Sequence, residues 1–324
     1  MKIQSFISGM ISYAPGGNEW LFNRRKARRN VAGTLNARYC YSVWLRHLIL
    51  ANRHGVLKGV PETVAELGPG NSLGAGLAAL LSGVDTYYAF DVVDHTASDN
   101  NLNIFEQLLD LFQRRENIPD RNEFPQIMTE VDSNRFPDNI LTDKVLEASL
   151  SKDRVEAIRE DLLNIEDKKR TPNHITYVVP WNDSRVIKTS SVDMLFSMSV
   201  LEHVDNLELT YRAMYQWLKK GGFMSHEIDF KCHGHAKQWN GHWACSDIAW
   251  RLIRGNRPFL LNRAPHSAHI RFLEENDFEI IADIQKQAPS EIGRNELAPR
   301  FRSLSDDDLI TYNAFILSSK SCKS

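Results

Sequence analysis

The chain has 324 residues, of which 42% are hydrophobic and 25% charged, a balance typical of a folded globular protein with one large α/β domain or two smaller ones. Its formal net charge of −2 gives no general argument for nucleic acid or an anionic membrane as a partner, and no run approaches the roughly 18 apolar residues of a transmembrane segment. The four cysteines are widely spaced without a CxxC pair, which excludes a disulfide framework or a typical zinc site and favours a cytoplasmic location.

Residues 1–60 precede the first expected strand, and we interpret them as a helical leader or cap. The mildly apolar stretch 6–14 is interrupted by serines and glycine and has its basic residues after it, which does not fit a signal peptide. The basic cluster at 24–29 fits a solvated helix face better than a site for an anionic substrate or membrane, and both alternatives stay open. Residues 36–51 carry apolar side chains near helical spacing, so His47 among them is expected to be a packing residue.

A glycine turn follows the first expected strand, at 62–67, and leads into a helix expected at 73–82. The turn reads Glu66-Leu67-Gly68-Pro69-Gly70. A strand, a glycine turn and a helix in this order bring backbone N–H groups to a nucleotide-like ligand. A dinucleotide fingerprint would need glycine where this chain has Leu73, so the turn disfavours a dehydrogenase.

A second strand is expected at 86–90, and it ends at Asp91, where a carboxylate can accept hydrogen bonds from ribose hydroxyls. Residues 96–172 are too long for a simple crossover, so we expect a helical insertion that could form a lid, a substrate wall or an oligomer surface. The strands and helices of the core continue after this insertion. We expect strands at 175–179, 191–197, 223–228, 278–284 and 313–318, and helices at 206–219 and 266–276.

These motifs together resemble the class I S-adenosylmethionine-dependent methyltransferases, over residues 60–285 without the insertion. The most specific motif is Ser191-Val192-Asp193-Met194-Leu195-Phe196-Ser197-Met198-Ser199-Val200-Leu201-Glu202-His203-Val204, followed by a helix and Lys-Lys-Gly-Gly-Phe. The resemblance implies a Rossmann-like sheet of seven strands, the last of them antiparallel.

The same resemblance implies a role for each residue that matches a cofactor motif. Glu66 would orient the glycine turn and approach the methionine amino group, and Gly68 and Gly70 would allow the cofactor to approach the backbone closely. Asp91 would bind the ribose hydroxyls. Trp181 and Asn182 would border the adenine, and Ser197 would lie beside the methionine moiety. A carboxylate within the turn suits a positively charged sulfonium ligand that has no phosphate.

The acceptor site is expected just after the strand at 223–228, because parallel α/β sheets place substrate at the carboxyl ends of their strands. Four of the chain's 11 histidines lie in residues 226–242. A hydroxyl acceptor benefits from a general base, most often histidine. The preferred acid/base candidates are Asp229 and His233, then His203 and His226; the candidate substrate residues are His235, Trp239, His242 and Trp243.

Each candidate also has a structural alternative. Strand alternation places His226 or Glu227 in a packed layer, and the two tryptophans can cap the core as well as stack on a sugar ring. Some methyltransferases of this fold bind a divalent ion with Glu-x-x-Glu-His, but the first position here is Ser199. We therefore expect no metal, although Glu202, His203 and the downstream histidines could still assemble a site.

A looser resemblance, from Tyr211 to His269, is to methyltransferases encoded with surface-polysaccharide biosynthesis, and it implies a sugar or glycan hydroxyl as acceptor. The expected domains are the leader 1–60 and a methyltransferase domain 61–324, with insertions at 96–172 and 230–265. Another small molecule or a protein stays open as acceptor, as does a non-catalytic binding module. An oligomer could form through the helical insertion.

Overall fold

The computed structural model describes residues 2–26, 33–92, 98–167, 172–181, 183–257 and 260–321. None of the helices within these ranges is both long enough and apolar enough to cross a membrane. Asn182 and part of the basic cluster at 24–29 lie outside the described residues, and no side chain of that cluster is described.

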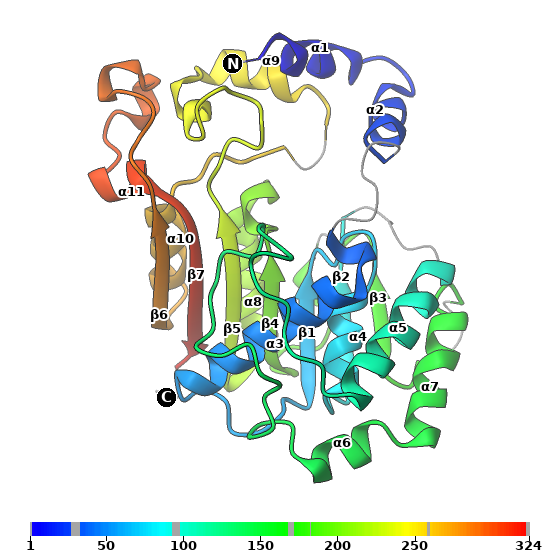
Figure 1. Ribbon diagram of the computed structural model, residues 1–324. Coiled ribbons are helices and arrows are strands. Elements are labelled where there is room, and N and C mark those ends of the chain that lie inside the picture. The colour runs from blue at the N-terminus through cyan, green and yellow to red at the C-terminus, as the bar shows by residue number, and fades with distance from the viewer. Residues whose placement is uncertain are drawn as a thin grey trace.

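Strands and helices alternate along most of the chain (Figure 1). The strands are β1 Thr63–Leu67, β2 Thr86–Phe90, β3 Ile175–Val178, β4 Val192–Met198, β5 Leu218–Asp229, β6 Phe278–Gln287 and β7 Thr311–Lys320. The α-helices are α1 Ile3–Ile11, α2 Gly17–Lys26, α3 Ala37–Arg53, α4 Gly74–Leu81, α5 Ser98–Gln113, α6 Asp143–Ser149, α7 Lys152–Leu163, α8 Leu207–Trp217, α9 Asp247–Arg254, α10 His266–Glu275 and α11 Asp306–Ile310. The described residues also form short 3-10 helices: η1 Gly33–Leu35, η2 Ser184–Val186, η3 Leu201–His203, η4 Gly241–Ala244, η5 Arg294–Glu296 and η6 Pro299–Phe301.

The seven strands form one sheet in the order β3-β2-β1-β4-β5-β7-β6. Strands β1 to β5 pair in parallel, and β7 is antiparallel to both β5 and β6. The order reverses between β1 and β4, so the carboxyl ends of these two strands flank the crevice where open α/β sheets bind ligands. The expected Rossmann-like sheet with an antiparallel last strand is confirmed.

Helices cover both faces of the sheet. One core joins α3, α4 and α5 to one face, and the second joins α8 and α10 to the other. Helix α3 begins at Ala37 because the side chain of Asn36 accepts hydrogen bonds from the N–H groups of Arg38 and Tyr39. Within it, His47 is 2% exposed and its Nδ1 lies 2.6 Å from Ser225 Oγ on β5. This is the packing role that the sequence predicted.

Helices α1, α2 and α9 form a cap beyond the carboxyl ends of the parallel strands (Figure 1). Helices α1 and α9 touch through their backbones, since a Cβ atom on Gly9 would lie 1.9 Å from the carbonyl oxygen of Leu252. The N–H of Lys2 donates to the carbonyl of His235 at 2.8 Å, so α1 also rests on the loop after β5. The first 60 residues therefore include the cap helices α1 and α2 and the core helix α3.

One expected boundary differs. The helix expected at 206–219 ends at Trp217, and β5 begins at Leu218 instead of Phe223. Lys219-Lys220-Gly221-Gly222 has the composition of a helix end, but Leu218 pairs with Val192 of β4 and the register then shifts through a bulge. The glycines permit the bulge that brings Phe223 into register with Met194.

The segment between β2 and β3 holds α5, α6 and α7, and residues 114–142 between α5 and α6 contain neither helix nor strand. Two buried side chains fasten this stretch to the core. Arg46 of α3 donates to the carbonyls of Pro119 and Thr129 at 2.8 and 2.9 Å, and Glu227 of β5 accepts from the N–H groups of Met128 and Thr129 at 2.9 and 3.2 Å.

Candidate active site

The glycine turn after β1 requires glycine at two positions for steric reasons. Gly68 and Gly70 have φ angles of 63° and 77°, in the left-handed region that side chains disfavour. A Cβ atom on Gly68 would also lie 2.7 Å from both methyl groups of Val200, in the loop after β4. The hydroxyl of Thr34 accepts from the N–H of Asn71 at 2.9 Å, so the segment before α3 lies against the turn.

Glu66, the carboxylate inside the turn motif, is 3% exposed. Its Oε2 accepts a hydrogen bond of 2.5 Å from the hydroxyl of Tyr87 on the neighbouring strand β2. Burial raises the pKa of Glu66 to about 8, and the bonds from Tyr87 and the N–H of Gly76 partly oppose this shift. The free protein thus holds Glu66 largely protonated at neutral pH, and a cationic group beside it would favour ionisation.

Asp91 and Trp181 lie just beyond the carboxyl ends of β2 and β3. Asp91 is 7% exposed and its Oδ1 accepts from the N–H of Val92 at 2.7 Å. The carbonyl of Asp91 accepts from the N–H of Trp181 at 2.9 Å, which ties together the ends of β2 and β3. The Trp181 ring packs edge-on against Trp217 at 5.4 Å. A ribose contact by Asp91 and an adenine contact by Trp181 stay predictions.

Ser197 and His226 form a buried pair across β4 and β5. Ser197 is fully buried, and its Oγ lies 2.7 Å from Nδ1 of His226, which is 1% exposed. Burial lowers the pKa of His226 to about 3, so this ring is neutral. Glu227 is also buried, at 2%, because both faces of the sheet are covered. Both residues, and not one of the two, are therefore packed.

Asp229 and His233 meet where β5 ends. Nε2 of His233 lies 3.2 Å from Oδ2 of Asp229, and Nζ of Lys231 lies at the same distance from that oxygen. Burial raises the pKa of Asp229, but the hydrogen bond from His233 and the charge of Lys231 outweigh it, so the pKa lies below its ordinary value. His233 has a φ of 45°, a conformation uncommon for a residue with a side chain and frequent at functional sites.

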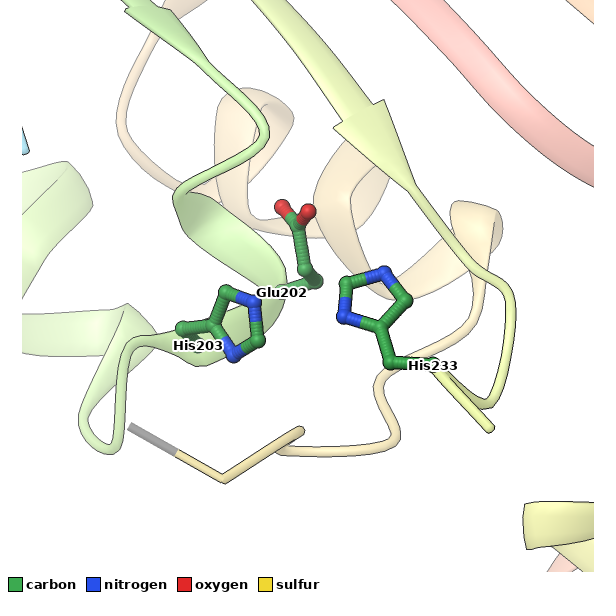
Figure 2. Close-up of side chains that lie close together, drawn as sticks. All are labelled: Glu202, His203 and His233. Carbon is green, nitrogen blue, oxygen red and sulfur yellow. The ribbon is translucent and has the colours of Figure 1, made fainter. Parts of the chain in front are cut away.

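Three side chains from the loops after β4 and β5 lie close together, those of Glu202, His203 and His233 (Figure 2). One ligand atom from each lies within 4.8 Å of the others, and the two imidazole centres are 5.1 Å apart. Glu202 is 3% exposed, and neither carboxylate oxygen accepts a hydrogen bond of good geometry from the described residues. Burial, with a contribution from the charge of Asp229, raises the pKa of Glu202 well above its ordinary value, and the nearby N–H groups of Glu202 and Asp229 oppose this shift only in part. This carboxyl therefore holds a proton or needs a cation.

The remaining candidates lie in the loop after β5 but point to structural roles. His235 Nδ1 lies 3.0 Å from Ser5 Oγ, and the indole of half-buried Trp239 donates to the carbonyl of Pro289 at 3.1 Å. His242 is 2% exposed, and burial lowers its pKa to about 3. Trp243 is fully buried and donates to the carbonyl of Arg263 at 3.1 Å, as the core-capping alternative anticipated.

Two residues of this region were missed as candidates. Lys231 shares the Asp229 carboxylate with His233, and its spacing of two residues from Asp229 was the signal available in the sequence. Glu202 was considered only as a weakened metal motif, because no sequence pattern reveals that a carboxyl will be buried without a partner.

A hollow of about 670 Å³ lies beside this region, between the start of α8, α10 and the η6 loop. Polar side chains line it, among them Asp205, Asn262, Arg271 and Asp308. None of its lining residues belongs to the glycine turn, so it is separate from the candidate cofactor crevice.

A family model described as a methyltransferase domain matches residues 144–225, from α6 into β5. The match spans less than half of the chain and does not include the glycine turn. Together with the sheet order it supports methyl transfer, with S-adenosylmethionine as the cofactor. A search of curated proteins found no match.

Similar solved structures include a SAM-dependent methyltransferase from Methanosarcina mazei, at 12% identity and a TM-score of 0.43, covering 84% of this chain and 98% of that one. Another is an S-adenosylmethionine-dependent methyltransferase from Mesorhizobium loti, at 14% identity and a TM-score of 0.39, covering 82% of this chain and 94% of that one. Structures this distant, with TM-scores below 0.5, do not assign a function to this chain. The function is therefore inferred from the geometry of the site.

Proposed function

We propose that this protein transfers a methyl group from S-adenosylmethionine to a hydroxyl of a sugar or glycan, without a metal ion. The observation that carries the proposal is the contact between Asp229 and His233 at the carboxyl end of β5, beside the crevice between β1 and β4. S-adenosylmethionine, when bound, supplies an electrophilic methyl group on a sulfonium sulfur. The protein must then position a hydroxyl and accept its proton.

The Asp229 contact fixes which nitrogen of His233 can act as the base. An ionised carboxylate only accepts hydrogen bonds, so Nε2 of His233 carries the proton and Nδ1 is the free acceptor. Nδ1 would take the hydroxyl proton, and the adjacent Asp229 would stabilise the imidazolium that forms. Figure 2 shows one nitrogen of the His233 ring directed toward His203, so the acceptor hydroxyl belongs between these two rings.

The residues of the crevice fit the cofactor's charges. S-adenosylmethionine carries positive charge on its sulfonium and amino groups. Glu66 on β1 and Asp91 directly after the adjacent strand β2 are both buried carboxyls. Glu66 would hold the amino group and Asp91 the ribose hydroxyls. Gly68 and Gly70 leave no side chain between them and the ligand.

A divalent cation is the specific alternative, because Glu202, His203 and His233 offer two imidazoles and a carboxylate. Chelator-treated protein that keeps full turnover would support the metal-free proposal. Loss of turnover with chelator, restored by Mn²⁺ or Zn²⁺ in the wild type but not in Glu202→Gln, would replace it with a metal-assisted reaction.

The test of the proposal separates cofactor binding from transfer. Titration calorimetry with S-adenosylmethionine should show binding that Asp91→Ala weakens, and the absence of binding by the intact protein would refute the proposal. Mass spectrometry of products from nucleotide-sugars, oligosaccharides and other metabolites then identifies the acceptor. His233→Ala should abolish transfer while cofactor affinity is kept, with His235→Ala as a control from the same loop.

Two other outcomes of that experiment would change the proposed acceptor or the proposed catalytic role. Methylation of a metabolite or protein but of no glycan would replace the acceptor in the proposal, since residues 96–172 and 230–265 set specificity and the core does not. Cofactor binding without S-adenosylhomocysteine formation on any acceptor would favour a non-catalytic binding module. A cytoplasmic location and assembly through the helical insertion are further parts of the proposal.

A further inference from the structure

The exposed large apolar side chains gather on the cap at the N-terminal end of the chain. Ten such residues occur in the described parts of the chain, and seven of them lie in residues 3–20 or on α9. The seven are Ile3, Ile7, Met10, Tyr13, Trp20, Ile248 and Leu252. Scattered single apolar residues are normal on protein surfaces, but a concentration on one small region marks an interaction site.

Helix α1 is amphipathic with its apolar ridge turned away from the protein. Ser5 and Gly9 are buried on the side that meets Arg257 and α9. Ile3, Ile7 and Met10 follow the i, i+4, i+7 spacing of the opposite side and are 77%, 53% and 62% exposed. The ridge therefore has no partner among the described residues.

Helix α9 repeats this arrangement beside α1. Trp250 and Ile253 are buried beneath it, while Ile248 and Leu252, four residues apart, are 75% and 46% exposed. The backbones of the two helices are in contact at Gly9 and Leu252, so the two helices that carry the ridges pack directly against each other. Figure 1 shows this layer at one end of the molecule, beyond the carboxyl ends of the parallel strands.

The cap is also basic, in a chain whose formal net charge is −2. Lys2, α1, α2 and α9 together contain six Lys or Arg residues and only two acidic ones, Glu19 and Asp247. Asp247 is paired with Arg263 and Arg300, and Arg254 is paired with Asp205. Apolar ridges on short helices accompanied by Lys and Arg are typical of proteins that lie on an anionic bilayer surface.

We propose that the cap formed by α1, α2 and α9 docks on an anionic membrane surface. The ridges of α1 and α9 enter the boundary between headgroups and acyl chains, and the exposed Lys2 and Arg251 meet the lipid phosphates. The underside of α1 rests on the loop that carries His233, through Lys2 and Ser5. Docking would thus hold the candidate active site one helix layer from the membrane. The proposal stands on the cap alone and does not require the proposed methyl transfer.

The experiment is co-sedimentation of the full chain with vesicles of phosphatidylcholine alone or with about one-third phosphatidylglycerol. We expect binding to the anionic vesicles that weakens as salt is raised. Ile7→Asp/Ile248→Asp should lower the partition coefficient at least about tenfold, because each change removes a buried apolar contact with lipid. Leu163→Asp is the matched control, since Leu163 is 63% exposed on α7, away from the cap.

Circular dichroism and thermal unfolding of each variant exclude misfolding as the cause of lost binding. Equal sedimentation of the wild type with both vesicle types and with no vesicles would overturn the proposal. So would a cap variant that binds as well as Leu163→Asp. Light scattering that shows a wild-type oligomer, dissociated by the cap substitutions, without vesicle binding would assign the ridges to contact between copies of this chain instead.

Discussion

Glu66 makes the binding of S-adenosylmethionine depend on pH. The carboxyl has a pKa of about 8 in the free protein because it is buried, so about nine in ten molecules hold it protonated at pH 7. A cationic ligand favours the ionised form and lowers this pKa. Binding at pH 7 should therefore release about 0.9 proton, and affinity should rise with pH until about 7.5, above which the ligand's own amino group loses its proton and opposes the gain.

The size of the effect follows from the fraction of free protein that is already ionised. Between pH 6 and pH 7 that fraction rises about ninefold for a pKa of 8, and the association constant should rise by the same factor. Titration calorimetry in two buffers of different ionisation enthalpy measures both the affinity and the protons released. The window below pH 7.5 keeps the ligand's own amino group protonated.

Two variants make this prediction specific. Glu66→Gln keeps an oxygen for the Tyr87 hydroxyl but cannot ionise, so the pH dependence and proton release should disappear. Tyr87→Phe removes a hydrogen bond that lowers the Glu66 pKa, so the rise in affinity should move to higher pH. Constant wild-type affinity from pH 6 to 7, or an unchanged slope in Glu66→Gln, would refute the reasoning.

Three further predictions concern the same crevice. Gly68→Ala should lower the free energy of unfolding by about 2–4 kcal/mol, from its positive φ and the clash with Val200, and Val200→Ala should recover part of the loss in denaturant titrations. Ser197→Ala should cost about 1–3 kcal/mol because it leaves His226 Nδ1 unpartnered, and adding His226→Leu should restore stability; an additive loss would contradict this. Asp91→Asn should weaken the cofactor affinity measured by calorimetry about tenfold or more with an unchanged melting temperature, since the amide oxygen can still accept from Val92.

The sheet was largely predictable because its buried strands are short apolar runs and each ends at a recognisable turn. Glu62 to Leu67 and Thr86 to Phe90 were expected as strands, and β1 and β2 occupy nearly the same residues. The helix after the glycine turn was expected to pack tightly, and every residue of α4 is buried. The start of β5 was missed, because its bulge depends on pairing with β4 and not on local composition.

The site was less predictable because burial decides what a polar residue can do. A cluster of histidines around the end of β5 predicted the acceptor site, yet His226 and His242 are buried and His235 contacts the cap. Asp229 and His233 were selected for their place at the end of the expected strand, and the structure brings them together. The burial of Glu202 beside His203 and His233 arises where the loops after β4 and β5 meet, which a linear pattern does not encode.

Thr34 has a consequence for where this chain can be shortened. Its hydroxyl supports the glycine turn at Asn71, its carbonyl accepts from the hydroxyl of Ser72, and helix α3 begins three residues later. A truncation that starts at residue 33 would remove α1 and α2, keep α9, and leave the contacts of Thr34 with the glycine turn in place. One that starts at 61 would also remove α3, which covers one face of the sheet. The fragment that begins at residue 33 is therefore the rational choice for crystallising the cofactor complex.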